Sequence, residues 1–182
     1  MTLCTIYDVT DKKLYQRRIE QQAYTDFLTG LYNRMCCERD LARQIDQAKK
    51  TGGEGALLYL DLDDFKHIND GLGHQYGDVL LKSISHALKR INGIENTCYR
   101  MGGDEFCVLL RDGDREHACA RDFVRRLDER RKELDFLPTV SFGSAEISSE
   151  NVVTVKDRAD HNMYRYKKER KAHRMSGDAG EE

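Results

Sequence analysis

The sequence has no paired cysteines, no long apolar run and no large excess of charge of one sign. Its six cysteines include no C-x-x-C pair and no metal-ligand spacing, so we interpret them as reduced thiols in a cytoplasmic protein. No apolar stretch approaches the ~20 residues that a membrane span needs, which predicts no direct membrane contact for this chain. A longer parent protein would still be free to carry an anchor. With 30 Lys and Arg against 32 Asp and Glu, no general attraction to nucleic acid is expected.

The common nucleotide and cation motifs are also absent. Neither the Rossmann pattern G-x-G-x-x-G nor the Walker pattern G-x-x-x-x-G-K-[ST] occurs, which excludes those nucleotide-binding folds by motif. An EF-hand loop counted from Asp61 fails because its sixth position is Lys66 instead of glycine and its twelfth is Leu72 instead of glutamate. Any site for a nucleotide or a cation must therefore be of another kind.

What the chain does have is the length and composition of one domain with short appendages. Its 182 residues, 39% hydrophobic and 34% charged, suit a single core under a well-solvated surface. We expect residues 1–23 to be the last strand and the linker helix of an upstream unit, residues 24–173 the main domain, and residues 174–182 a polar tail. The last seven residues of that tail, SGDAGEE, need no structure. The linker helix is explained equally well as a solvated helix or as a rod that carries an upstream signal.

The order of predicted elements indicates an α/β sandwich. Residues 56–62 are a nearly continuous apolar run closed by an acid, as expected of a strand buried on both faces. Two β-rich segments, 97–101 and 105–110, flank a glycine pair, which predicts a hairpin. The other expected elements are helices over 34–50, 64–70, 78–91, about 114–134 and about 155–172, a loop over 71–77 and a strand over about 139–147. This order predicts an α+β sandwich in which helices flank a largely antiparallel sheet.

Acidic residues gather at two points of the sequence that a shared cation could bring together. Asp61 and Asp63 close the predicted central strand, and we expect only one of them to line a site. Asp104 and Glu105 follow the glycine pair at the hairpin tip, where two adjacent acids repel each other without an evident structural need. A cation shared with Asp61 would relieve that repulsion, and Mg²⁺ is typically held by one or two carboxylates together with substrate phosphates. The pattern therefore indicates nucleotide chemistry.

The segment between these acids contains side chains suited to a guanine base. Asn69 and Asp78 have the required groups, because a carboxylate accepts two N–H donors and an amide both donates and accepts. His67 and His74 lie in the same segment, but a helix cap or a core hydrogen bond explains each of them better than catalysis does.

Four runs of the sequence together resemble a known family. The runs DFLTGLYNR, DLDDFKHINDGLGHQYGD, RMGGDEF and ADHNMYRYKKER, spread over roughly residues 24–172, resemble the GGDEF family of diguanylate cyclases in content and order. The N-terminal TIYDVTDKK looks like the end of a PAS sensor domain that leads into a linker helix. The resemblance implies a ferredoxin-like, nucleotidyl-cyclase-like fold.

The resemblance also implies a reaction and a metal site. In this family, two GTP molecules, each on one domain of a homodimer, are joined into cyclic di-GMP with release of pyrophosphate. The metal is Mg²⁺, or Mn²⁺ in its place, and its ligands match Asp61, the Leu62 carbonyl and Asp104. Asp104 and Glu105 match the two acids of the family signature, which the resemblance implies to be catalytic.

The substrate contacts follow from the same resemblance. Asn69 and Asp78 match the family's guanine contacts, and the aspartate at position 78 favours GTP over ATP. The phosphate contacts match four positions, which are Phe65, Lys66, Lys167 and Lys171.

The sequence departs from the family at two places. The last helix keeps Lys167, but Arg170, Lys171 and Ala172 stand where the family has glycine, arginine and asparagine, so Lys171 or neighbouring Arg170 would supply the missing charge. Gly93 and Asn96 replace an Arg-x-x-Asp product-inhibition site, and we predict no inhibition there. The leading hypothesis is an active cyclase. Its rival is a catalytically weak GTP-binding regulatory domain, and a plain interaction domain is the least favoured reading.

Overall fold

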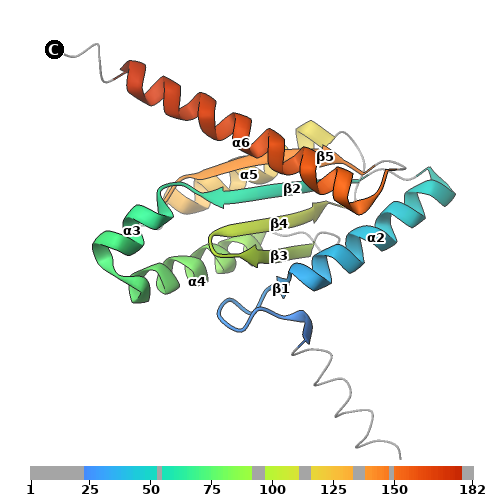
Figure 1. Cartoon of the computed structure of the whole chain (residues 1–182), viewed down its shortest axis with the longest axis horizontal. Helices are drawn as coiled ribbons and strands as arrows, with labels where there is room; N and C mark the ends of the chain where they lie inside the picture. The colour runs from blue at the N-terminus through green and yellow to red at the C-terminus, as the bar shows by residue number, and fades with distance from the viewer. Residues whose placement is uncertain are drawn as a thin grey trace, which may run out of the picture.

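In the part of the chain that the structure describes, the sheet has five strands in the order β1-β3-β4-β2-β5 (Figure 1). The computed structural model describes residues 23–52, 55–91, 97–110, 116–132, 138–147 and 150–177. The strands are β1 (Tyr32–Asn33), β2 (Ala56–Leu62), β3 (Thr97–Gly102), β4 (Glu105–Leu110) and β5 (Val140–Glu146). Only β1 and β3 pair in parallel, whereas the other neighbouring strands are antiparallel. The predicted largely antiparallel sheet is thus confirmed.

Helices cover both faces of this sheet, as expected for the sandwich. They are α2 (Arg34–Thr51), α3 (Phe65–Leu72), α4 (His74–Ile91), α5 (Glu116–Lys132) and α6 (Val152–Gly177). Helices α2 and α6 pack on one face, and α4 and α5 pack on the other (Figure 1). Within the described residues, no helix combines the length and the apolar character needed to span a membrane.

Strand β2 is the centre of the core because it is buried on both faces along its whole length. Leu58 and Leu60 pack with the α4 and α5 side, while Leu57 and Tyr59 pack with the α2 and α6 side. Side chains alternate between faces along a strand, so Asp61 continues the odd-numbered series. The acid at the end of β2 therefore faces α6.

The segment predicted as a loop over 71–77 is mostly helical. Helix α3 continues to Leu72 and α4 begins at His74, four residues earlier than expected. Gly73 alone separates them, with a φ of 85° that side chains rarely adopt. The glycines suggested a longer loop, but only Gly73 needs the special conformation. Asp78 consequently lies inside α4 and not at its start.

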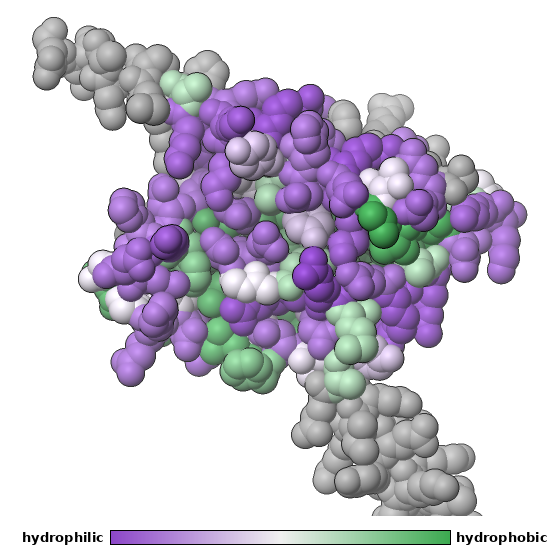
Figure 2. Space-filling model, in the orientation of Figure 1, coloured by the Kyte–Doolittle hydropathy of each residue, from purple (hydrophilic) through white to green (hydrophobic). Residues whose placement is uncertain are grey.

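Helix α6 extends farther than the sequence pattern indicated. It runs to Gly177, so it is longer than the helix expected over about 155–172 and includes the first two residues of the SGDAGEE segment, Ser176 and Gly177. The remaining tail residues lie outside the described part of the chain, as do the strand and most of the helix expected within residues 1–23. The face of the molecule that α2 and α6 cover is mostly hydrophilic (Figure 2), in keeping with the high charge content.

Candidate active site

The candidate site forms where the end of β2 meets the turn between β3 and β4. The strand register places Asp61 directly opposite Glu105. One residue further, the backbone N–H of Leu62 donates to the carbonyl oxygen of Asp104 over 3.3 Å. All four residues that the sequence assigned to metal binding and catalysis are thereby brought together.

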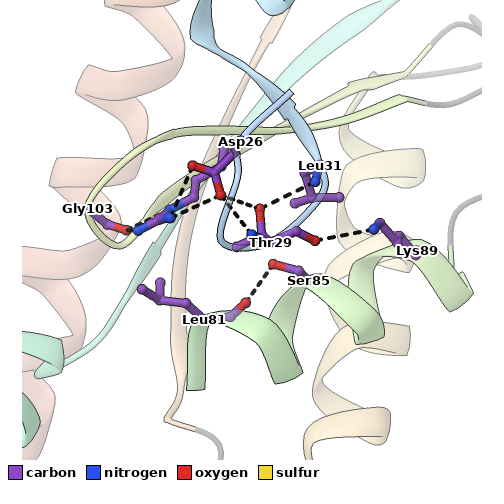
Figure 3. Close-up of polar contacts among 8 residues, drawn as sticks. Asp26, Thr29, Leu31, Leu81, Ser85, Lys89 and Gly103 are labelled. Atoms are coloured by element: carbon purple, nitrogen blue, oxygen red, sulfur yellow. Dashed lines mark hydrogen bonds and ion pairs between the residues drawn. The ribbon is translucent and has the colours of Figure 1, made fainter. Parts of the chain in front are cut away.

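The turn that carries Asp104 is fixed by its own glycines and by Arg100. Gly102 and Gly103 have φ values of 145° and 51°, which let the chain reverse tightly. The Arg100 side chain donates from Nε and Nη2 to the Gly103 carbonyl over 3.1 and 2.8 Å. Its Nη1 donates to both carboxylate oxygens of Asp26 over 3.0 and 3.2 Å, and Figure 3 shows the resulting chain of contacts.

Asp26 is in turn held by the loop that precedes α2. Thr29 donates to Asp26 Oδ1 from its backbone N–H over 2.9 Å and from its hydroxyl over 2.6 Å. Lys89 of α4 donates to the Thr29 carbonyl over 3.3 Å (Figure 3). Sequence reasoning missed this network, because Asp26 and Arg100 lie 74 residues apart and no local pattern pairs them.

Asp61 is buried and lies near the negative charges of Asp63 and Asp104. Burial is the main cause that raises the pKa of its carboxyl group. The hydrogen bond and the charge of Lys167 lower this pKa in part, whereas Asp104 and Asp63 raise it further. The ionised form of Asp61 is therefore disfavoured overall, and a cation beside it would stabilise that form.

Glu105, which pairs with Asp61 from the neighbouring strand β4, is also partly buried among acids. Burial is again the largest cause of its raised pKa, followed by the charges of Asp160, Asp61 and Asp104. Arg34 at the start of α2 opposes the shift in part. A carboxyl group with a raised pKa is a candidate general acid or base, because its pKa lies closer to neutral pH.

The donor atoms suit a metal ion that is bound together with a substrate. Asp61, Asp104 and the Leu62 carbonyl could supply oxygen ligands, which Mg²⁺ prefers. In the part of the chain that the structure describes, no group of three or more His, Cys, Asp or Glu side chains is arranged to hold a metal. Mg²⁺ commonly takes one or two carboxylates and completes its shell with water and phosphate oxygens. The residues present fit that mode of binding.

Helix α6 brings positive charge to the acid cluster. Lys167 Nζ donates a hydrogen bond to Asp61 Oδ1 within an ion pair. Burial alone would lower the pKa of Lys167, but the contact with Asp61 and the charges of Asp63 and Asp104 raise it overall. Lys171 is exposed four residues later, on the same side of the helix. The two lysines expected to bind phosphate thus lie along one helical face.

Asp63 and Arg170 pair with each other beside the site. Asp63 accepts from the hydroxyls of Thr139 and Ser141 over 2.6 and 2.5 Å and from Arg170 Nη1 over 2.9 Å. Both of its oxygens therefore have partners within the protein. Of the two acids at the end of β2, Asp61 is therefore the one that remains as a candidate metal ligand. Arg170 is engaged by the same contact, so Lys171 is the freer of the two cations that follow Lys167.

The start of α3 offers backbone donors beside these side chains. Phe65 is buried at the first position of the helix, and Lys66 is exposed next to it. The N-cap residue Asp64 has a φ of 59° and makes no side-chain capping hydrogen bond. A helix start of this kind has N–H groups that suit a phosphate.

The two residues assigned to guanine lie on α3 and α4. Asn69 is half-buried near the end of α3, and Asp78 is exposed in the second turn of α4. Within the described residues, Asn69 Oδ1 is buried and has no hydrogen-bond partner. Buried polar atoms without a partner are uncommon in folded proteins. Because this oxygen lies against Gly77 and has no access to the surface, the Nδ2 end of the amide is the one that a base could meet.

Comparison with known proteins relates this site to a family. The family described as "Diguanylate cyclase, GGDEF domain" matches residues 23–173. The diguanylate cyclase DgcM of Escherichia coli K12 is 31% identical over 170 residues, which cover 92% of this chain and 42% of DgcM. The uncharacterized protein YhcK of Bacillus subtilis is 36% identical over 150 residues, which cover 81% of this chain and 40% of YhcK. The chain thus spans less than half the length of these relatives.

Solved structures show the same relationship. The coiled coil and GGDEF domain of DgcB from Caulobacter crescentus, in complex with c-di-GMP, has a TM-score of 0.76 and 28% identity and covers 88% of each chain. The diguanylate cyclase SiaD of Pseudomonas aeruginosa, in complex with its activator SiaC, has a TM-score of 0.74 and 26% identity, over 88% of this chain and 66% of SiaD. This chain therefore belongs to the GGDEF-domain family of diguanylate cyclases.

Proposed function

We propose that this chain condenses two GTP molecules into cyclic di-GMP in a Mg²⁺-dependent reaction at the interface of two identical domains. The main support is the contact between β2 and the signature turn, which sets Asp61 against Glu105 and Leu62 against Asp104. Lys167 faces this cluster from α6. The site thus joins acids suited to a metal with a cation suited to phosphate.

Asp61, Asp104 and the carbonyl of Leu62 would hold Mg²⁺, or Mn²⁺ in its place. The bound ion would neutralise charge on the triphosphate and lower the basicity of the attacking 3′-hydroxyl. Burial and the neighbouring acids raise the pKa of Glu105, which suits this carboxylate to accept the proton of that hydroxyl. Each new bond joins the 3′-oxygen of one GTP to the α-phosphorus of the other and releases pyrophosphate.

The phosphate groups would be held from two sides. On one side, the first turn of α3 offers its N–H groups near Phe65 and the side chain of Lys66. On the other side, α6 offers Lys167 and Lys171. Lys167 is paired with Asp61, and we expect it to transfer its hydrogen bond to a phosphate oxygen when the nucleotide binds. Asn69 and Asp78 would bind the guanine edge, with Asp78 selecting GTP over ATP.

The direct test is product formation. The protein at high concentration is incubated with GTP and Mg²⁺, and cyclic di-GMP is quantified by mass spectrometry. We expect product from the wild-type chain and a loss of about 100-fold or more in Asp104→Ala. Asp70→Ala, which removes an exposed acid of α3, is the matched control and is expected to retain activity. Absence of product from the wild-type chain would refute the cyclase proposal.

A catalytically weak GTP-binding regulatory domain is the second candidate. Three observations favour it. Arg170 and Lys171 replace the usual end of the last helix, and Arg170 is engaged by Asp63. In addition, the cyclic di-GMP phosphodiesterase NbdA of Pseudomonas aeruginosa is 38% identical over 115 residues, so related sequence occurs in proteins named for another activity. GTP binding without product at high protein concentration would identify this second function.

We also propose the setting in which the chain works. The catalytic domain would span residues 24–173 in a cytoplasmic protein, downstream of a PAS-like sensor and a linker helix, and would need a homodimer for turnover. Residues 1–22 lie outside the described part of the chain, as do Gly93 and Asn96. We predict no product inhibition through residues 93–96, and cyclic di-GMP binding that is lost on changing them would contradict this.

A further inference from the structure

The contact between Asn69 and Gly77 is unusually close and connects the two residues proposed to bind guanine. A Cβ atom built on Gly77 would lie 1.9 Å from Asn69 Oδ1 and 2.9 Å from Asn69 Cγ. Real Cβ atoms essentially never approach a heavy atom to less than 3.0 Å. The Asn69 amide therefore occupies the space that any side chain at position 77 would need.

We infer that Gly77 is a positioning residue for base recognition, because its missing side chain fixes where the Asn69 amide lies beside Asp78. This inference rests on the proposed GTP-binding function. It adds a residue that contacts no substrate atom and acts through Asn69.

The backbone around the contact is itself tied together, so the crowding cannot be relieved by moving the two helices apart. The Gly73 N–H donates to the Asn69 carbonyl over 2.9 Å, and the Gly77 N–H donates to the Gly73 carbonyl over 3.3 Å. Gly77 is buried and directly precedes Asp78. These bonds hold the end of α3 against the first turn of α4, with residues 69 and 77 facing each other.

A larger residue at position 77 would therefore displace the Asn69 side chain. The next nearest atom to the added Cβ is Phe65 Cζ, at 3.2 Å, which a small adjustment accommodates. The tip of Asn69 is the most easily moved of these groups, because it turns about two side-chain bonds. The predicted consequence is a rotated amide in an intact fold.

The position of the amide decides which of its two ends a base could meet. Asn69 Oδ1 is buried against Gly77 without a hydrogen-bond partner among the described residues, so a base would meet the Nδ2 end. That amino group would donate to O6 of guanine, whereas adenine has an amino group, itself a donor, at the same place. Loss of the amide position should therefore weaken GTP more than ATP.

The experiment compares Gly77→Ala with Gly71→Ala. Gly71 lies on α3 with nothing within 4 Å of an added Cβ, so its substitution is the matched control. GTP and ATP affinities are measured by calorimetry with Mg²⁺, and folding is checked by thermal unfolding. We expect Gly77→Ala to weaken GTP binding by about tenfold or more and ATP binding by less than about twofold. Gly71→Ala should leave both affinities within about twofold of the wild-type values.

A double-variant cycle tests whether Gly77 acts through Asn69. In an Asn69→Ala background, the added Gly77→Ala change should alter GTP affinity by less than about twofold, because the displaced group is already gone. Additive losses, or wild-type GTP affinity in Gly77→Ala, would overturn the inference.

The same cycle covers failure to fold and failure of the proposed function. If Gly77→Ala alone does not fold, the double variant Asn69→Ala/Gly77→Ala should still fold, because it lacks the amide that the added methyl group would meet. A double variant that does not fold would also overturn the inference. A wild-type chain that shows no preference for GTP over ATP would refute the proposed guanine site and the inference together. A clear wild-type preference that Gly77→Ala leaves unchanged would refute the inference alone.

Discussion

At the scale of single residues, Arg100 and Asp26 connect the signature turn to the segment before α2. Arg100 and Asp26 are mostly buried, with side-chain exposures of 11% and 16%. Burial raises the pKa of Asp26, but hydrogen bonds from Thr29 and Arg100 outweigh burial and the net pKa is lowered. The pair therefore stabilises the fold only while Asp26 is ionised.

This gives a prediction about acid stability. Because the folded-state pKa of Asp26 lies below its unfolded value of 3.8, its contribution is present above that value and is lost as pH falls through the folded pKa. Asp26→Asn should remove about 1 kcal/mol of stability near neutral pH and progressively less toward about pH 2. Chemical denaturation of both proteins across this range measures the difference. An equal deficit at every pH would contradict the prediction, and Asp70→Asn serves as the exposed control.

Lys167 is a second residue whose contacts lead to a prediction. It donates a hydrogen bond to Asp61 Oδ1, so it would compete there with the proposed metal ion, and its positive charge would suit a triphosphate. Lys167→Met should therefore strengthen binding of Mn²⁺ alone by a few-fold and weaken Mg²⁺–GTP binding by about tenfold or more. Paramagnetic resonance of Mn²⁺ and nucleotide titration measure the two effects. Lys168→Met, at the exposed neighbouring position, should change neither the Mn²⁺ affinity nor the Mg²⁺–GTP affinity. Weaker Mn²⁺ binding in Lys167→Met would contradict the prediction that Lys167 competes with the metal ion for Asp61.

At the scale of elements, α6 is the helix that positions the cations of the site. It packs against β5 at Gly143, where an added Cβ would lie 2.0 Å from Met163 N and 2.5 Å from the Ala159 carbonyl oxygen. Asn162 secures the same approach by donating to the Ser144 carbonyl over 2.9 Å. Since the close atoms at Gly143 belong to the α6 backbone, no side-chain rotation relieves the contact.

Gly143→Ala should consequently shift α6 as a unit. We expect a loss of about 1–3 kcal/mol of stability from overpacking, which lowers the melting temperature by several degrees. GTP binding should weaken as well, because Lys167 moves with the helix. Thermal unfolding and nucleotide titration measure both effects, with Gly71→Ala as the control glycine. An unchanged melting temperature would show that α6 does not need this close approach.

At the scale of the whole molecule, the proposed reaction needs two copies of the domain, because each would carry one GTP. Product formed per domain should therefore rise with protein concentration instead of staying constant. Adding a severalfold excess of Asp104→Ala to a fixed amount of wild-type protein should lower the yield of cyclic di-GMP, since mixed pairs contain one defective site. The same excess of Asp70→Ala should raise it. Equal rates with and without the Asp104→Ala variant would argue that one domain suffices.

The sequence by itself indicated most of the elements in their order, although not the short strand β1, and it pointed to the family. The apolar run over 56–62 required a strand buried on both faces, and the glycine pair at 102–103 required a tight turn. Local periodicity and turn chemistry specify such features directly. The same reasoning misjudged the segment over 71–77, because a glycine is compatible with a helix and only Gly73 has a φ that excludes one.

Only the tertiary structure decided which side chains meet. Lys167 and Asp61 lie 106 residues apart, and Arg170 and Asp63 lie 107 apart, so no sequence spacing could show that one acid faces a movable cation while the other is enclosed by hydrogen bonds. The approach of Asn69 to Gly77 depends in the same way on how two helices join at one residue. The physical reason is that local preferences fix backbone conformation, whereas the partners of a charged or polar side chain are fixed by packing between distant elements.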